Sequence, residues 1–79
     1  MELNKRELKI LNYLDRNKNE YVYKKQLHTN LNISYPLVLR TLEVLEAKGL
    51  IELIVLGHMT IVKINNNGTN ELHNSKVVT

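Results

Sequence analysis

The side chains that could catalyse a reaction or hold a metal ion are few and scattered. The sequence has no cysteine and three histidines, His28, His58 and His73. No two of these histidines share the four-residue spacing that places metal ligands on one helical face. Neither Ser34 nor Ser75 belongs to a recognisable set of nucleophile, base and acid. We therefore expect neither an enzyme nor a metal or cofactor site.

The charge of the chain is mildly positive. The formal net charge is +3 and the isoelectric point is about 9.3, which permits attraction to phosphates without demanding it. An ordinary soluble protein with surplus lysine would have the same balance. The N-terminus lacks the apolar stretch of a signal peptide. The longest apolar run, residues 50–56, contains Glu52 and is too short to span a bilayer. We expect a cytoplasmic protein without a membrane segment.

The first element that the sequence predicts is a helix over residues 4–17. Asn4 and Glu7 have the spacing of a capping box. The side of this helix that faces solvent is basic and carries Lys5, Lys9, Asn12 and Arg16. A basic face on a surface helix is most often a solvated face, and that is the interpretation we expect here.

The central part of the chain predicts two helices joined by a tight turn. Residues 21–23 favour a short strand, and residues 24–31 a short helix. Asn32 and Ile33 then form the turn into a helix over residues 34–48. Ser34 is expected to cap that helix through its hydroxyl. Pro36 suits its first turn.

The rest of that helix has an inner face and a defined end. Val38, Leu42 and Leu45 share one face at about 100° per residue, and Gly49 suits the left-handed residue that ends a helix.

The pattern after Gly49 changes from helical to extended. Residues 50–56 and 59–64 are rich in β-branched and apolar types, and only Gly57-His58 separates them. A two-residue loop led by glycine is typical of a type II′ hairpin. Asn65 or Asn66 is expected to cap a last short helix that ends at residue 74. We predict one domain over residues 1–74 and a frayed tail over residues 75–79.

Two residue patterns summarise this organisation: Leu31-x-Ile33-Ser34-x-Pro36-x-Val38-x-Arg40-x-Leu42-x-Val44-Leu45-Glu46-x-x-Gly49-Leu50-Ile51 and Ile64-Asn65-x-x-Gly68-x-x-Leu72. Over about residues 4–72 the chain resembles the winged helix-turn-helix domain of small bacterial and archaeal regulators of the ArsR, MarR and PadR types. The resemblance implies an α+β fold: a three-helix core, a short strand, a two-stranded wing hairpin and a short C-terminal helix.

The resemblance also implies a set of DNA contacts. In that family the third helix enters the major groove, and the hairpin, called the wing, touches the backbone or the minor groove. The residues of this chain that the resemblance places at DNA are Lys24, Lys25, His28, Ser34, Tyr35, Leu37, Arg40, Thr41 and His58. Arg40 could make a two-pronged contact with guanine, or instead contact a phosphate or pair with Glu43.

Three features depart from the family pattern. Leu37 and Leu39, which we expect to be exposed, could touch a thymine methyl group or mark a protein interface. The wing tip has no Arg or Lys, and Glu43 adds an acidic group to the third helix. The predicted function is a transcriptional regulator of double-stranded DNA, a repressor that occupies its operator as a homodimer. The alternative is a winged-helix module that binds protein without nucleic acid, and a third interpretation is RNA binding.

The homodimer is expected to form through apolar side chains that exceed the needs of one small core. Those side chains are Val55, Leu56, Met59 and Ile61 of the hairpin, with Leu72, Val77 and Val78 near the C-terminus.

Overall fold

The computed structural model describes the backbone of residues 2–78 and the side chains of residues 2–74. Residues 2–78 contain four helices and three strands. They are α1 (Lys5–Arg16), β1 (Val22–Tyr23), α2 (Lys24–Leu31), α3 (Tyr35–Ala47), β2 (Ile51–Leu56), β3 (Met59–Ile64) and α4 (Asn66–Val78). This is the order that the sequence predicts.

Helix α1 begins at the predicted capping box. The backbone N–H of Glu7 donates to Asn4 Oδ1, and the backbone N–H of Asn4 donates to Glu7 Oε1, each at 2.8 Å. Two N–H groups that a helix start would leave unpaired are satisfied in this way. The capping box therefore fixes where α1 begins.

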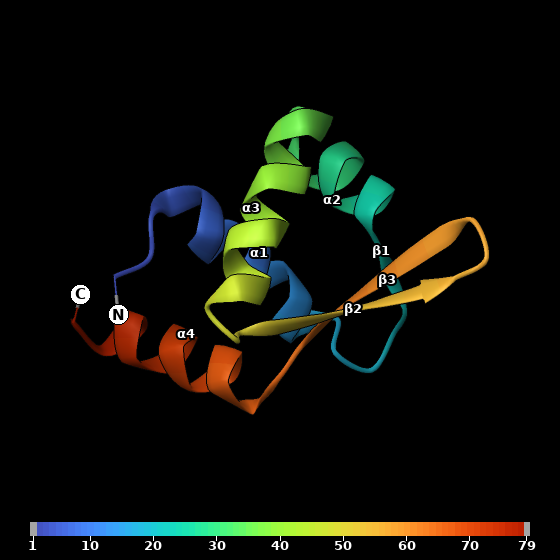
Figure 1. The fold of residues 1–79 in the computed structure, drawn as a ribbon. Helices are drawn as coiled ribbons and strands as arrows, with labels where there is room; N and C mark the ends of the chain where they lie inside the picture. The colour runs from blue at the N-terminus through green and yellow to red at the C-terminus, as the bar shows by residue number, and fades with distance from the viewer. Residues whose placement is uncertain (1, 79) are drawn as a thin grey trace.

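The sheet is small and antiparallel, with the strand order β1-β3-β2. Strands β2 and β3 pair along their whole length, from Ile51 opposite Ile64 to Leu56 opposite Met59. Gly57 has φ +61°, and His58 is not among the described residues with positive φ. That combination is typical of the predicted type II′ turn. Figure 1 shows the hairpin, the wing, projecting from the helical body.

The core is aliphatic and lies between α1, α2, α3, α4 and the base of the wing. Its fully buried side chains are Ile10, Leu11, Leu14, Leu27, Leu42, Leu45, Leu50, Leu72, Val38 and Val62. Ile61 is also buried, with 2 % of its surface exposed. The expectation that Ile61 and Leu72 meet a second copy is therefore wrong, because neither reaches the surface. The side chains of Val77 and Val78 lie outside the described residues.

Helix α4 is tied to the two ends of the wing. Asn65 Oδ1 accepts from the backbone N–H of Gly68 at 2.9 Å, so Asn65 caps the helix as predicted. Asn65 Nδ2 donates to the carbonyl oxygen of Gly49 at 2.8 Å, and the Asn65 backbone N–H donates to the Leu50 carbonyl at 3.2 Å. The helix continues to Val78, so the expected end at residue 74 is wrong. Within the predicted tail, residue 79 lies outside the described residues.

Candidate nucleic-acid interface

The outward ridge of α3 is the side that the core does not use. Val38, Leu42 and Leu45 point inward and are almost wholly buried. At about 100° per residue, the opposite ridge carries Pro36, Arg40, Glu43 and Ala47, all exposed. Among residues 2–74 the ion pair found is Lys48–Glu7, so Arg40 is not paired with Glu43. The guanidinium of Arg40 therefore faces outward without an internal partner.

Two predictions about α3 are wrong. Thr41 is 3 % exposed, and its Oγ1 donates to the carbonyl oxygen of Leu37 at 2.7 Å. The hydroxyl is used within the helix, so Thr41 does not lie on the outward side. Ser34 is the residue before α3, but its hydroxyl makes no capping hydrogen bond. Its backbone carbonyl accepts from the Val38 N–H at 3.0 Å instead, and its exposed hydroxyl is left for an outside partner.

Four of the predicted DNA contacts line one surface hollow of about 280 Å³. Lys24 and Lys25 come from the start of α2, Tyr35 from the start of α3, and His58 from the tip of the wing. Two cations, a phenol and an imidazole are the donors that suit phosphate oxygens. The fold thus collects side chains from three separate segments beside the beginning of α3.

His28 is exposed, and its ring also contacts Ile33 and Tyr35 within the protein. His28 Nδ1 lies 2.6 Å from the carbonyl oxygen of Ile33, and since a carbonyl only accepts, Nδ1 is the donor. The ring also meets Tyr35 edge-on, with centroids 6.0 Å apart and planes at 76°. His28 therefore fixes the α2–α3 turn, whose Asn32 has φ +54°, and orients Tyr35 toward the hollow.

A second hollow of about 320 Å³ lies on the other side of the start of α3. Its lining joins the first turns of α1 to the α2–α3 turn: Lys5, Arg6, Lys9, Asn32, Ile33, Ser34 and Leu37. Leu37 is 38 % exposed at its edge, as predicted, whereas Leu39 is half-buried. The expectation of an exposed Leu39 is therefore wrong.

The acidic residue of this part of α1 is turned away from the second hollow. Glu7 is 4 % exposed, and its Oε2 accepts from Lys48 Nζ at 2.8 Å. Burial alone would raise the pKa of Glu7. The hydrogen bonds from Lys48 and Asn4, with the charges of Lys48 and Arg6, outweigh burial and lower that pKa below its usual value. Glu7 is thus a carboxylate with its own internal cation.

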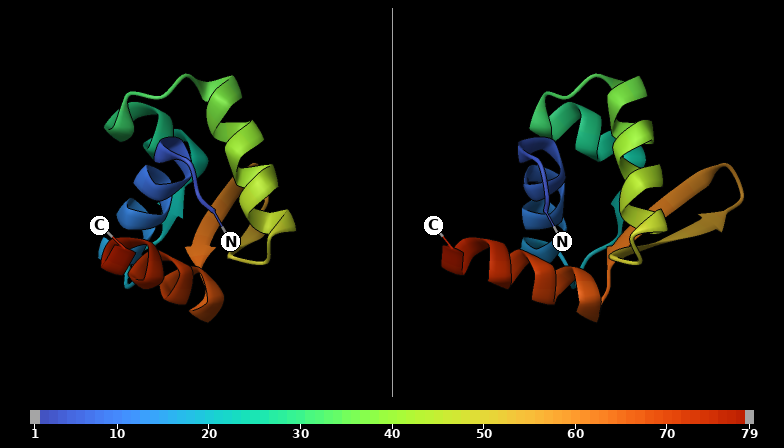
Figure 2. Two further views of the ribbon diagram at one scale, coloured as in Figure 1. Left: turned by 90° about the vertical axis from the view of Figure 1, so that its left-hand side faces the viewer. Right: turned by 60° about the vertical axis from the view of Figure 1, so that its left-hand side comes forward.

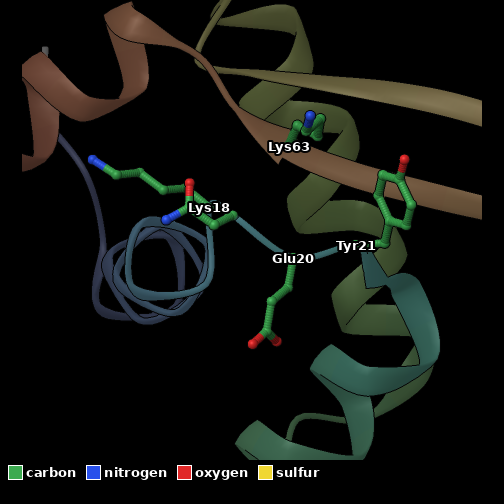
Figure 3. Close-up of a pocket in the computed structure, with 5 residues that line it drawn as sticks. Lys18, Glu20, Tyr21 and Lys63 are labelled. Carbon is green, nitrogen blue, oxygen red and sulfur yellow. The ribbon is translucent and has the colours of Figure 1, made fainter.

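A third hollow, of about 580 Å³, has no convergent chemistry. It is lined by Lys18, Asn19, Glu20, Tyr21 and Lys63, and Figure 3 shows the side chains of Lys18 and Glu20 pointing away from each other. Within the described residues, no group of three or more His, Asp or Glu side chains is placed to hold a metal ion. In the same residues, no helix is both long enough and apolar enough to cross a membrane.

No protein-family model matches the sequence, and no curated protein is similar to it. Solved structures do share its fold. A protein of Archaeoglobus fulgidus superposes with a TM-score of 0.85 at 17% identity, over 96% of this chain and 86% of that one. A MarR-family transcriptional regulator of Rhodococcus sp. RHA1 has a TM-score of 0.85 at 14% identity. That match covers 95% of this chain and 54% of the Rhodococcus protein, so this chain spans about half its length.

A third solved structure is a homodimeric winged helix-turn-helix DNA-binding domain from Mycobacterium bovis, from a possible ArsR-family transcriptional regulator. It superposes with a TM-score of 0.78 at 21% identity, over 95% of this chain and 68% of that one. These likenesses confirm the predicted winged helix-turn-helix fold.

Proposed function

We propose that this chain is a transcriptional regulator that binds double-stranded DNA, with α3 in the major groove. The observation that carries the proposal is the hollow beside α3, where Lys24, Lys25, Tyr35 and His58 converge from three segments. Arg40 lies on the adjoining outward ridge without an internal ion pair. Proteins with this fold that are described as DNA-binding regulators support the same function.

The chemistry of each side chain indicates which part of the DNA it contacts. Lys24 and Lys25 contact the phosphate backbone, since an ammonium group is a point charge without directional preference for a base. Arg40 reads a guanine in the groove, because its planar fork matches two acceptors at once. Ser34, Tyr35 and His28 border the backbone contacts, while Leu37 and His58 lie at the two margins.

The test is binding to random duplex DNA at several salt concentrations. Phosphate-dominated binding weakens with salt, with a slope of about −0.9 per neutralised phosphate. The double variant Lys24→Gln/Lys25→Gln should flatten that slope by about two units. A matched control is Lys18→Gln/Lys63→Gln, which removes the same charge from the third hollow, whose lining includes no residue of α3 and none of the predicted DNA contacts. Absence of binding by the wild-type protein at low salt would refute the proposal.

The finer proposal is a repressor that occupies its operator as a homodimer. A structural neighbour described as homodimeric supports this, as does the exposure of Val55, Leu56 and Met59 on the wing. Light scattering at high micromolar concentration measures the mass, and a monomer there would contradict the dimer. The same exposed side chains of the wing also favour the alternative, a module that binds only protein. If the protein binds no duplex DNA, this alternative becomes the better explanation.

A further inference from the structure

Helix α3 has a basic flank on each side, and only one of them belongs to the proposed interface. The first flank is formed by Lys24 and Lys25 beside Tyr35. The second is the α1 flank, formed by Lys5, Arg6 and Lys9, which line a hollow with Ser34 and Leu37.

The position of Tyr35 and Leu37 on α3 shows that these flanks are on opposite sides of the outward ridge. At about 100° per residue, Tyr35 lies on one side of Pro36 and Leu37 on the other. Tyr35 borders the hollow that contains Lys24 and Lys25. Leu37 borders the hollow that contains Lys5 and Lys9. Figure 2 shows the first turns of α1 lying next to the turn that leads into α3.

The α1 flank is positive without a compensating acid. Lys5 and Lys9 are exposed and Arg6 is partly exposed, and the ion pair found among residues 2–74 involves none of them. The one acid between them, Glu7, is buried and paired with Lys48. Its charge is therefore neutralised from inside, and the charged side chains that line the hollow, Lys5, Arg6 and Lys9, are all cations.

The placement of these cations is unfavourable for the helix itself. Lys5 and Arg6 lie in the first turn of α1, where the positive end of the helix dipole repels cations. An anion bound at the α1 flank would relieve both this repulsion and the mutual repulsion of Lys5, Arg6 and Lys9.

We infer that the α1 flank binds the phosphate backbone of the same DNA duplex, on the side of α3 opposite Lys24 and Lys25. The inference rests on the proposed function and extends it. The two sugar-phosphate backbones that border one major groove are both held, one by α2 and one by α1. Leu37 lines the same hollow as Lys5 and Lys9, so this leucine lies at the edge of the contact.

The experiment compares the salt dependence of binding to random duplex DNA for two double variants. Lys5→Gln/Lys9→Gln removes two charges from the α1 flank. Glutamine has a shorter side chain than lysine, but it is polar, unbranched and similar in helix propensity. Lys18→Gln/Lys63→Gln removes the same net charge from the third hollow. If Lys5 and Lys9 each contact a phosphate, the slope of log K against log salt flattens by about 1.8 for the first variant. The control keeps the wild-type slope.

The difference of about 1.8 in slope corresponds to a measurable difference in affinity. Between 50 and 200 mM salt, the wild-type protein should lose about twelvefold more affinity than Lys5→Gln/Lys9→Gln. Equal slopes for wild type and Lys5→Gln/Lys9→Gln, with binding intact, would overturn the inference while leaving the proposed function standing. Equal flattening in both double variants would also overturn it, because the effect would then be one of net charge. If wild type itself does not bind, the proposed function fails and the inference with it.

Discussion

The ion pair between Glu7 and Lys48 joins the start of α1 to the end of α3, and its removal tests how firmly the two helices are held. Lys48→Met keeps most of the side-chain volume but removes the charge. Glu7 is then left buried, with its Asn4 N–H bond but without its cation. Breaking a fully buried pair costs about 3–5 kcal/mol. Because the side chain of Lys48 is 27% exposed, we expect a smaller loss of about 2 kcal/mol.

The stability lost in Lys48→Met should depend on pH, in a direction set by the pKa of Glu7. The pKa of Glu7 is lowered in the folded protein, so its contribution to stability is complete above the unfolded pKa of about 4.3. That contribution is lost as the pH falls through the folded pKa, where Glu7 becomes protonated. In Lys48→Met the buried carboxyl loses its main lowering partner and its pKa rises. The stability gap between wild type and variant should therefore be widest near pH 7 and should narrow toward pH 3.

Thermal unfolding followed by circular dichroism measures the gap. For a domain of this size, about 2 kcal/mol corresponds to a lowering of Tm by about 8–16 °C. Lys63→Met is the matched control, since Lys63 is exposed on β3, and its Tm should stay close to that of wild type. A Lys48→Met protein that melts like wild type at pH 7, or a gap that widens in acid, would refute the reasoning.

Two further predictions concern single positions. In Gly68→Ala the added methyl would overlap the carbonyl oxygen of Leu50 and the side chain of Ile64; because one of these is backbone, we expect a loss of about 2 kcal/mol or more, measured as a lower urea midpoint. Thr41→Val removes a hydroxyl that is hydrogen-bonded within α3, so the affinity for duplex DNA should be unchanged. Arg40→Ala should lose about 1–3 kcal/mol of discrimination between bases at one base pair. Specific binding that falls for Thr41→Val and not for Arg40→Ala would reverse our assignment of the outward ridge.

The sequence predicts the elements well because their signals are local. The capping box at Asn4, the left-handed Gly49 and the two-residue turn at Gly57 each depend on neighbours within four residues, and each is confirmed. The predicted end of α4 at residue 74 is wrong. Residues 75–78 contain neither glycine nor proline, so no local signal ends the helix there. The capping role of Ser34 was also wrong, since its hydroxyl makes no bond to the helix.

The candidate interface is less predictable because it depends on how helices pack. The sequence marks α1 as basic but cannot tell which end of α1 lies against α3, so the cations Lys5 and Lys9 could only be interpreted as a solvated face. Thr41 is a polar residue beside the inner face of α3, and nothing local signals that its hydroxyl bonds the Leu37 carbonyl. The convergence of His58 with Lys24 likewise needs the whole hairpin to be placed.

The hydrogen bonds of Asn65 limit how the wing can move. The Asn65 side chain connects Gly49, two residues before β2, to Gly68 in the first turn of α4, and the Asn65 backbone N–H donates to the Leu50 carbonyl. Both strands are thus anchored where they leave the helical body, so the hairpin cannot swing about a loose hinge at its root. It can adapt to a curved surface only by twisting along its length, and the largest displacements must occur at Gly57-His58.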